Sequence, residues 1–266
     1  MKFINLLNNT EPIILHLNGS RRSFIQENKF NELIINSSKI KKPEDLTIIT
    51  CATEIPDCYS KSPLIKQLNF NNIDFINIGE LHDNKLEPWS NLLKIKYLYN
   101  FIKDNTITTK YVCFLDAADI LLSEDFDKII SKFLKLNNNL VWGSQIYNYP
   151  EGRTVGLKEP INDYEKEKES DINNFLCSGV CIGFTDTFIE YINITYKNID
   201  KNKNIWNSDQ YEIKKTFRSY YKELNVDYDS KSYLSFSPPG STENDKLMFS
   251  ISQNNNLIIP KIKEII

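Results

Sequence analysis

The chain has 266 residues, of which 41% are hydrophobic and 12% aromatic, so it carries enough apolar material to fold and is unlike a disordered protein. Its 32 basic and 35 acidic side chains are interspersed and give a net charge of -3. This balance argues against a basic surface for nucleic acid or anionic membranes. We therefore expect one folded domain over residues 1–266 with neither of these partners, while a homo-oligomer stays open.

The five cysteines form no Cys-x-x-Cys pair, and their odd number leaves at least one of them unpaired. The apolar run at the N-terminus is too short for a signal peptide, and no stretch approaches the length of a membrane span. We therefore expect a soluble protein of a reducing compartment, the cytoplasm of the producing or host cell. The abundance of Asn, Lys and Ile is typical of an AT-rich genome, such as that of a large DNA virus.

Short apolar runs and amphipathic segments alternate in the first half of the chain. Residues 46–50 and 73–78 are predicted strands, and residues 89–103 carry apolar side chains at helical spacing. Residues 111–115 are apolar at every position, which is typical of a strand at the centre of a mostly parallel sheet.

The alternation continues in the second half. A helix is predicted to start at Ser123, with Glu124 and Asp125 in its first turn, and a strand follows at residues 140–142. Residues 151–171 are charged and rich in turn formers, which indicates a surface loop near the active site or a lid. The other predicted elements are a strand at residues 180–184 and helices at 185–197 and 208–217. This pattern indicates an α/β sheet of the doubly wound kind.

Two carboxylates, Asp116 and Asp119, directly follow the apolar strand 111–115. Open α/β sheets place their ligand sites at this end of their strands. An Asp-x-x-Asp turn can bind one divalent cation, which in turn can hold and neutralise a departing nucleotide diphosphate. The alternative is that both side chains only cap the turn and the helix that follows.

The run Asp116-Ala117-Ala118-Asp119 at a strand end resembles the glycosyltransferase domain of procollagen lysyl hydroxylases and their viral relatives. The resemblance extends over nearly the whole chain and implies a GT-A type α/β fold, in which helices flank a mixed, mostly parallel sheet. The other motifs that carry the resemblance are residues 49–53, Lys94, residues 142–145, 149–150 and 175–183, Asp209-Gln210 and residues 226–231.

In that family, a His-x-Asn-Gly-x-x-Lys segment near the C-terminal end completes the metal site. This chain carries His16-Leu17-Asn18-Gly19 near its N-terminus, with Arg22 in place of the Lys. We hypothesise a circular permutation, in which residues 1–45 are the closing segment and residues 46–266 hold the nucleotide-sugar and acceptor parts. His16 should then lie about 2.0 to 2.2 Å from the metal. The alternative is an ordinary strand-end histidine; the other histidine, His82, is expected in a loop.

The resemblance implies Mn²⁺ or another divalent cation, a UDP-sugar as donor, and hydroxylysine or galactosylhydroxylysine of a collagen-like polypeptide as acceptor. The donor is UDP-glucose or UDP-galactose. Thr50 and Thr53 would contact the nucleoside, while Lys94 and Arg22 would bind the phosphates by charge-assisted hydrogen bonds. The alternative for Lys94 is a position on a solvated helix face.

Asp209 and Gln210 near a helix start are expected to face the sugar and the acceptor hydroxyl. Asp209 would act as general base or would stabilise an oxocarbenium ion, and the alternative is an acid that only stabilises its helix. Asp227 or Asp229 is expected on the acceptor side. The predicted donor-binding residues also include Ser178, Gly179, Asn18 and Gly19.

Three positions depart from the family pattern. Ala118 stands where an aromatic residue is frequent, Gln145 lies near the position of a carboxylate, and Val180 replaces a glycine. These departures leave open a transferase with another glycan or protein acceptor, and also a non-catalytic pseudo-glycosyltransferase scaffold. Trp142 and Tyr149 could pack against a sugar or belong to the core.

Overall fold

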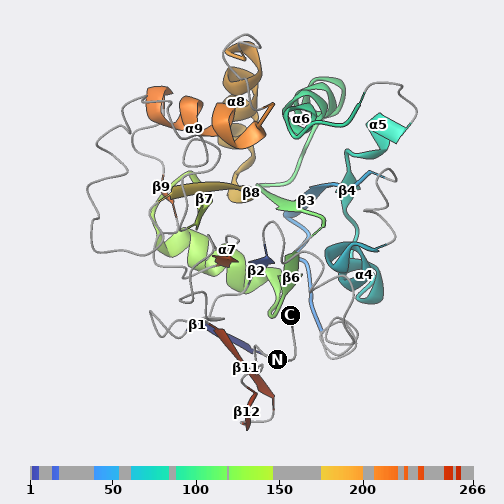
Figure 1. The fold of residues 1–266 in the computed structure, drawn as a ribbon, viewed down its shortest axis with the longest axis vertical. Coiled ribbons are helices and arrows are strands. Elements are labelled where there is room, and N and C mark those ends of the chain that lie inside the picture. The colour runs from blue at the N-terminus through green and yellow to red at the C-terminus, as the bar shows by residue number, and fades with distance from the viewer. Residues whose placement is uncertain are drawn as a thin grey trace.

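A computed structural model of the chain has an α/β fold (Figure 1). None of the helices in its described part combines the length and the apolar composition needed to cross a membrane. The structure describes residues 2–5, 14–17, 39–53, 61–83, 88–118, 120–145, 175–199, 207–220, 225–226, 233–236, 249–253 and 256–258.

A mixed six-stranded sheet lies at the centre of the described fold. Its order is β4-β3-β5-β8-β7-β9. The pairs β4–β3, β3–β5 and β7–β9 are parallel, whereas β8 is antiparallel to both of its neighbours. The sheet is thus mixed and mostly parallel, as predicted. The strands are β3 (Leu46–Cys51), β4 (Ile76–Asn77), β5 (Tyr111–Asp116), β7 (Leu140–Gln145), β8 (Phe175–Phe184) and β9 (Asn225–Val226).

Helices cover both faces of this sheet, which explains why β5 is apolar at every position (Figure 1). Tyr111, Cys113 and Leu115 point into one core with α4 and α7, while Val112 and Phe114 point into the other with α6, α8 and α9. Alternating side chains of a strand point to opposite faces, so both sets are buried. The helices are α4 (Pro63–Phe70), α6 (Leu92–Asp104), α7 (Phe126–Lys135), α8 (Thr185–Lys197) and α9 (Asp209–Tyr220).

Two three-stranded sheets complete the described strands. One has the order β10-β2-β6 and the other β1-β11-β12. In the first, β2 is parallel to β10 and antiparallel to β6. Their strands are β2 (Ile14–Leu17), β6 (Ile120–Leu122), β10 (Tyr233–Phe236), β1 (Lys2–Asn5), β11 (Phe249–Gln253) and β12 (Asn256–Ile258).

Several predicted boundaries change in the structure. The helix expected from Ser123 begins only at Phe126, because the backbone is still extended at its N-cap Asp125. The strand predicted at 73–78 is reduced to β4, and the strand predicted at 180–184 extends back to Phe175. The helix predicted at 185–197 is confirmed.

His82 is not in a loop. It lies in the short helix α5 (Glu80–Asp83), where only 6% of its surface is exposed. Its Nδ1 is 2.8 Å from the Tyr97 hydroxyl, and its ring packs edge-on against Trp89 with the centroids 5.2 Å apart. This aromatic cluster gives His82 a structural role.

Candidate functional site

Asp116 is the first polar side chain at the C-terminal end of a buried strand. The first five residues of β5 are buried, whereas the Asp116 side chain is 23% exposed. In the parallel register of β3 and β5, Asp116 is paired with Cys51. One residue earlier, the Thr50 hydroxyl donates a 2.7 Å hydrogen bond to the Leu115 carbonyl oxygen. The carboxylate therefore lies at the sheet edge where α/β proteins bind ligands.

Helix α4 and its N-cap Ser62 fix the backbone within the Asp-x-x-Asp turn and after it. The Ser62 hydroxyl caps the helix by accepting from the Ile65 N–H at 3.1 Å, and it donates to the Ala117 carbonyl at 2.6 Å. The Gln67 amide both accepts from the Leu122 N–H at 2.8 Å and donates to the Leu122 carbonyl at 2.7 Å. Ser62 and Gln67 are fully buried, so these bonds are shielded from water.

These two positioning residues were not predicted from the sequence. A signal for α4 was present, because Ser62 followed by Pro63 is a typical helix start, with an N-cap hydroxyl and a proline in the first turn. No sequence pattern indicated that Gln67 would pair with both backbone groups of Leu122.

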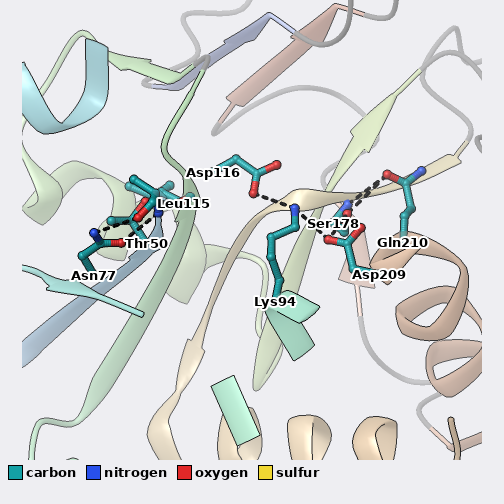
Figure 2. A network of polar contacts seen from close by, with 9 residues as sticks. Thr50, Asn77, Lys94, Leu115, Asp116, Ser178, Asp209 and Gln210 are labelled. Carbon is teal, nitrogen blue, oxygen red and sulfur yellow. Dashed lines mark hydrogen bonds and ion pairs between the residues drawn. The ribbon is translucent and has the colours of Figure 1, made fainter. Parts of the chain in front are cut away.

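The Asn77 side chain holds the end of β3 by two hydrogen bonds to the backbone of Ala52. The Asn77 Oδ1 accepts from the Ala52 N–H at 2.8 Å, and its Nδ2 donates to the Ala52 carbonyl at 2.9 Å (Figure 2). Gly79 lies against the same peptide, where a Cβ atom would be 1.9 Å from the Ala52 carbonyl oxygen. Asn77 therefore replaces the ladder hydrogen bonds that β4 is too short to supply.

Lys94 lies between two carboxylates that come from different elements (Figure 2). Its Nζ is 3.0 Å from Asp116 Oδ1 and 2.8 Å from Asp209 Oδ2. Lys94 is 8% exposed, so the alternative of a solvated helix face is wrong. Burial alone would lower the pKa of Lys94, but the charges of Asp116 and Asp209 outweigh it and hold the pKa well above its ordinary value. The ammonium is therefore charged at neutral pH.

Asp209 and Gln210 are placed together by the first turn of α9. Asp209 is the first residue of that helix, where the helix dipole favours a negative charge. Its Oδ2 is also 3.2 Å from the Ser178 hydroxyl of β8, and Gln210 Oε1 is 3.4 Å from the Ser178 amide nitrogen. Asp209 is 4% exposed. It therefore does more than stabilise its helix, because it joins Lys94 to β8.

The other predicted residues lie in different parts of the chain. Thr50 and Thr53 are buried at the C-terminal end of β3, and their contact with a nucleoside stays a prediction. Gly179 lies beside Ser178 in β8. Trp142 is 1% exposed and packs on Tyr191 with ring centroids 5.4 Å apart, so it belongs to the core. The residues outside the described part of the chain are Asp119, Asn18, Gly19, Arg22, Tyr149, Asp227 and Asp229.

The described residues offer a partial fit to a divalent cation. Among them, no group of three or more His, Cys, Asp or Glu residues could hold a metal ion. They do provide the Asp116 carboxylate, an oxygen donor of the kind that Mn²⁺ and Mg²⁺ bind. The backbone of His16 in β2 pairs with Ile120 in β6, which directly follows position 119. This register brings the strand of the predicted histidine ligand beside β6, the strand that follows the turn.

Two kinds of comparison with known proteins give a match. One solved structure, titled a glycosyltransferase involved in the glycosylation of the major capsid of PBCV-1, is 16% identical, with coverage of 73% of this chain and 82% of that one and a TM-score of 0.36. No curated protein matches the chain. The family described as the PLOD GT domain matches residues 42–259, which is most of the sequence. The chain therefore belongs to the PLOD GT domain family and is a glycosyltransferase domain with a GT-A type α/β fold.

Proposed function

We propose that this domain transfers glucose or galactose from a UDP-sugar to hydroxylysine or galactosylhydroxylysine of a collagen-like polypeptide. Mn²⁺ or another divalent cation bound by Asp116, Asp119 and His16 would assist the transfer. The observation that carries the proposal is the convergence of Asp116, Lys94 and Asp209 at the C-terminal edge of the parallel strands. Membership of a glycosyltransferase family supports the reaction class.

The proposed reaction exchanges one bond at the anomeric carbon of the sugar. The bond from this carbon to the diphosphate oxygen breaks, a bond to the acceptor hydroxyl oxygen forms, and the hydroxyl proton passes to a base. When bound, the cation would neutralise charge on the departing diphosphate. Lys94, which is charged and buried beside Asp116, would add a charge-assisted hydrogen bond to a phosphate oxygen.

Asp209 is the described residue best placed to receive the acceptor proton. Its contacts with Lys94 and Ser178 both use Oδ2. In the described part of the chain this arrangement leaves Oδ1 for the acceptor hydroxyl.

UDP release tests this function directly. Wild type would be assayed with UDP-glucose and UDP-galactose, with and without Mn²⁺, and with and without a galactosylhydroxylysine peptide. We expect release that requires Mn²⁺, increases with the peptide, and is lost in Asp116→Asn. The control variant Asp127→Asn makes the same change at an exposed position of α7 and should keep wild-type turnover.

Other outcomes would identify the remaining candidates. Metal-dependent hydrolysis without transfer to the peptide would favour a transferase with another glycan or protein acceptor. No turnover and no metal-dependent nucleotide binding would contradict catalysis and favour the scaffold. Equal turnover in Asp116→Asn and wild type would remove Asp116 from the metal site.

A further inference from the structure

Lys94 has two anionic partners that differ in their surroundings. Asp116 is partly exposed at the strand end, with 23% of its side chain accessible, whereas the Asp209 side chain is only 5% accessible. Asp209 is also stabilised by the start of α9 and by the Ser178 hydroxyl. The ammonium can therefore lose Asp116 and still remain paired with Asp209.

A cation that binds the Asp116 carboxylate would compete directly with this ammonium. The Lys94 Nζ is 3.0 Å from Asp116 Oδ1, which is hydrogen-bonding distance. Two positive charges on one carboxylate repel each other, and the repulsion is strong where water is partly excluded. Binding of a divalent cation therefore requires that Lys94 move away from Asp116 or be compensated by another negative charge.

We propose that Lys94 is an internal competitor of the metal: it neutralises Asp116 when no cation is bound, and it remains paired with Asp209 when a divalent cation takes Asp116. The inference rests on the proposed function, because it assumes that Asp116 is a metal ligand. Asp209 then acts as a positioning residue for the metal site in addition to any role toward the acceptor. Once Lys94 has left Asp116 and keeps only its contact with Asp209, two of its three N–H donors can face a phosphate.

The proposal predicts opposite effects for two charge removals. Lys94→Met removes the competitor and leaves the negative charge of Asp209, so Mn²⁺ should bind about tenfold more tightly than to wild type. Asp209→Asn leaves the ammonium with Asp116 alone, so Mn²⁺ should bind about tenfold more weakly. A merely structural role for Lys94 would give weaker binding in Lys94→Met, which is the reverse sign.

The test is a titration of the full chain with Mn²⁺ in the absence of UDP-sugar, monitored by the electron spin resonance of free Mn²⁺. Lys94→Met leaves a buried carboxylate without its cation and could fail to fold. The double variant Lys94→Met/Asp209→Asn removes both charges and is the second measurement. It should bind Mn²⁺ at least as tightly as wild type and clearly more tightly than Asp209→Asn.

Lys128→Met is the matched control for the loss of one positive charge. Lys128 is paired with Glu124 at 2.7 Å on the surface of α7 and should not affect the Mn²⁺ affinity. Equal affinities in wild type, Asp209→Asn and the double variant would overturn the proposal while leaving the metal-dependent function intact. No Mn²⁺ binding in any variant, wild type included, would overturn the metal-dependent function and the competitor role with it.

Discussion

His16 and Ile120 are paired residues of antiparallel strands although 104 positions separate them in the sequence. Ile120 follows the Asp-x-x-Asp turn, and the same register pairs Ile14 with Leu122. The backbone of His16 thus lies beside the strand that follows the Asp-x-x-Asp turn, and the circular permutation stays a hypothesis. The family match begins at residue 42, so this segment lies outside it. Ligation of the metal by His16 stays a prediction.

The first prediction concerns the nitrogen ligand of the metal. The chain has two histidines, and His82 is buried against Tyr97 and Trp89. A histidine nitrogen bound to Mn²⁺ should therefore come from His16. We expect electron spin echo spectra of bound Mn²⁺ to show histidine nitrogen coupling in wild type and in His82→Phe, but not in His16→Ala. A coupling that survives in His16→Ala would contradict the permuted metal site.

The second prediction concerns the hydroxyl that joins α4 to the turn. Ser62→Ala removes the helix cap at Ile65 and leaves the Ala117 carbonyl without this donor. We expect the free energy of unfolding to fall by about 1 to 3 kcal/mol and the Mn²⁺ affinity to fall with it, because the turn is less fixed. Urea denaturation and Mn²⁺ titration measure the two effects.

Ser131→Ala is the control for this change. Ser131 is exposed on α7, so the same substitution should change the free energy of unfolding by no more than about 0.5 kcal/mol. Unchanged stability and unchanged Mn²⁺ affinity in Ser62→Ala would show that α4 does not position the turn.

The sequence predicted the parts of the site that depend on strand pattern. An apolar run that ends in Asp116 is a local signal, and the structure places this residue at a strand end as expected. The ion pair between Lys94 and Asp209 is different, because it depends on how α6 and α9 pack over the sheet. The only local sign was that Lys94 shares the buried face of α6 with Leu98, four residues later.

Of two short strands, one was missed and the other was predicted too long, for a related reason. Strand β6 has three residues, and its extended form is imposed by β2 and by Gln67. Strand β4 has two residues and depends on Asn77, whose side chain pairs with Ala52. Tertiary contacts of this kind leave no periodic pattern in the sequence.

The third prediction concerns the close approach of Gly79 to the end of β3. Any Cβ at this position would meet the backbone of Ala52, which cannot move without disturbing its two hydrogen bonds to Asn77. Gly79→Ala should therefore lower the free energy of unfolding by about 1 to 3 kcal/mol, measured by urea denaturation. Glu80→Ala, one residue later and exposed, should stay within about 0.5 kcal/mol of wild type. Equal stability of the two variants would contradict the close packing of Gly79 against the backbone of Ala52.

The fourth prediction is a dependence of stability on alkaline pH. Burial raises the pKa of the Cys113 thiol from 9.0 to about 12. Between these values the unfolded chain has released the thiol proton while the folded chain retains it, so the unfolded state binds fewer protons and stability falls as pH rises. The stabilising effect is complete below pH 9.0 and is lost toward pH 12.

Urea denaturation from pH 8 to pH 10.5 measures this effect. Above pH 9, the free energy of unfolding of wild type should fall more steeply than that of Cys113→Ala, by up to about 1.4 kcal/mol per pH unit. Val112→Ala truncates a neighbouring buried side chain without removing a thiol, so it should lower stability at every pH and keep the wild-type slope. Parallel slopes for wild type and Cys113→Ala would mean that the thiol ionises equally easily in both states, and hence that the core around β5 admits water at alkaline pH.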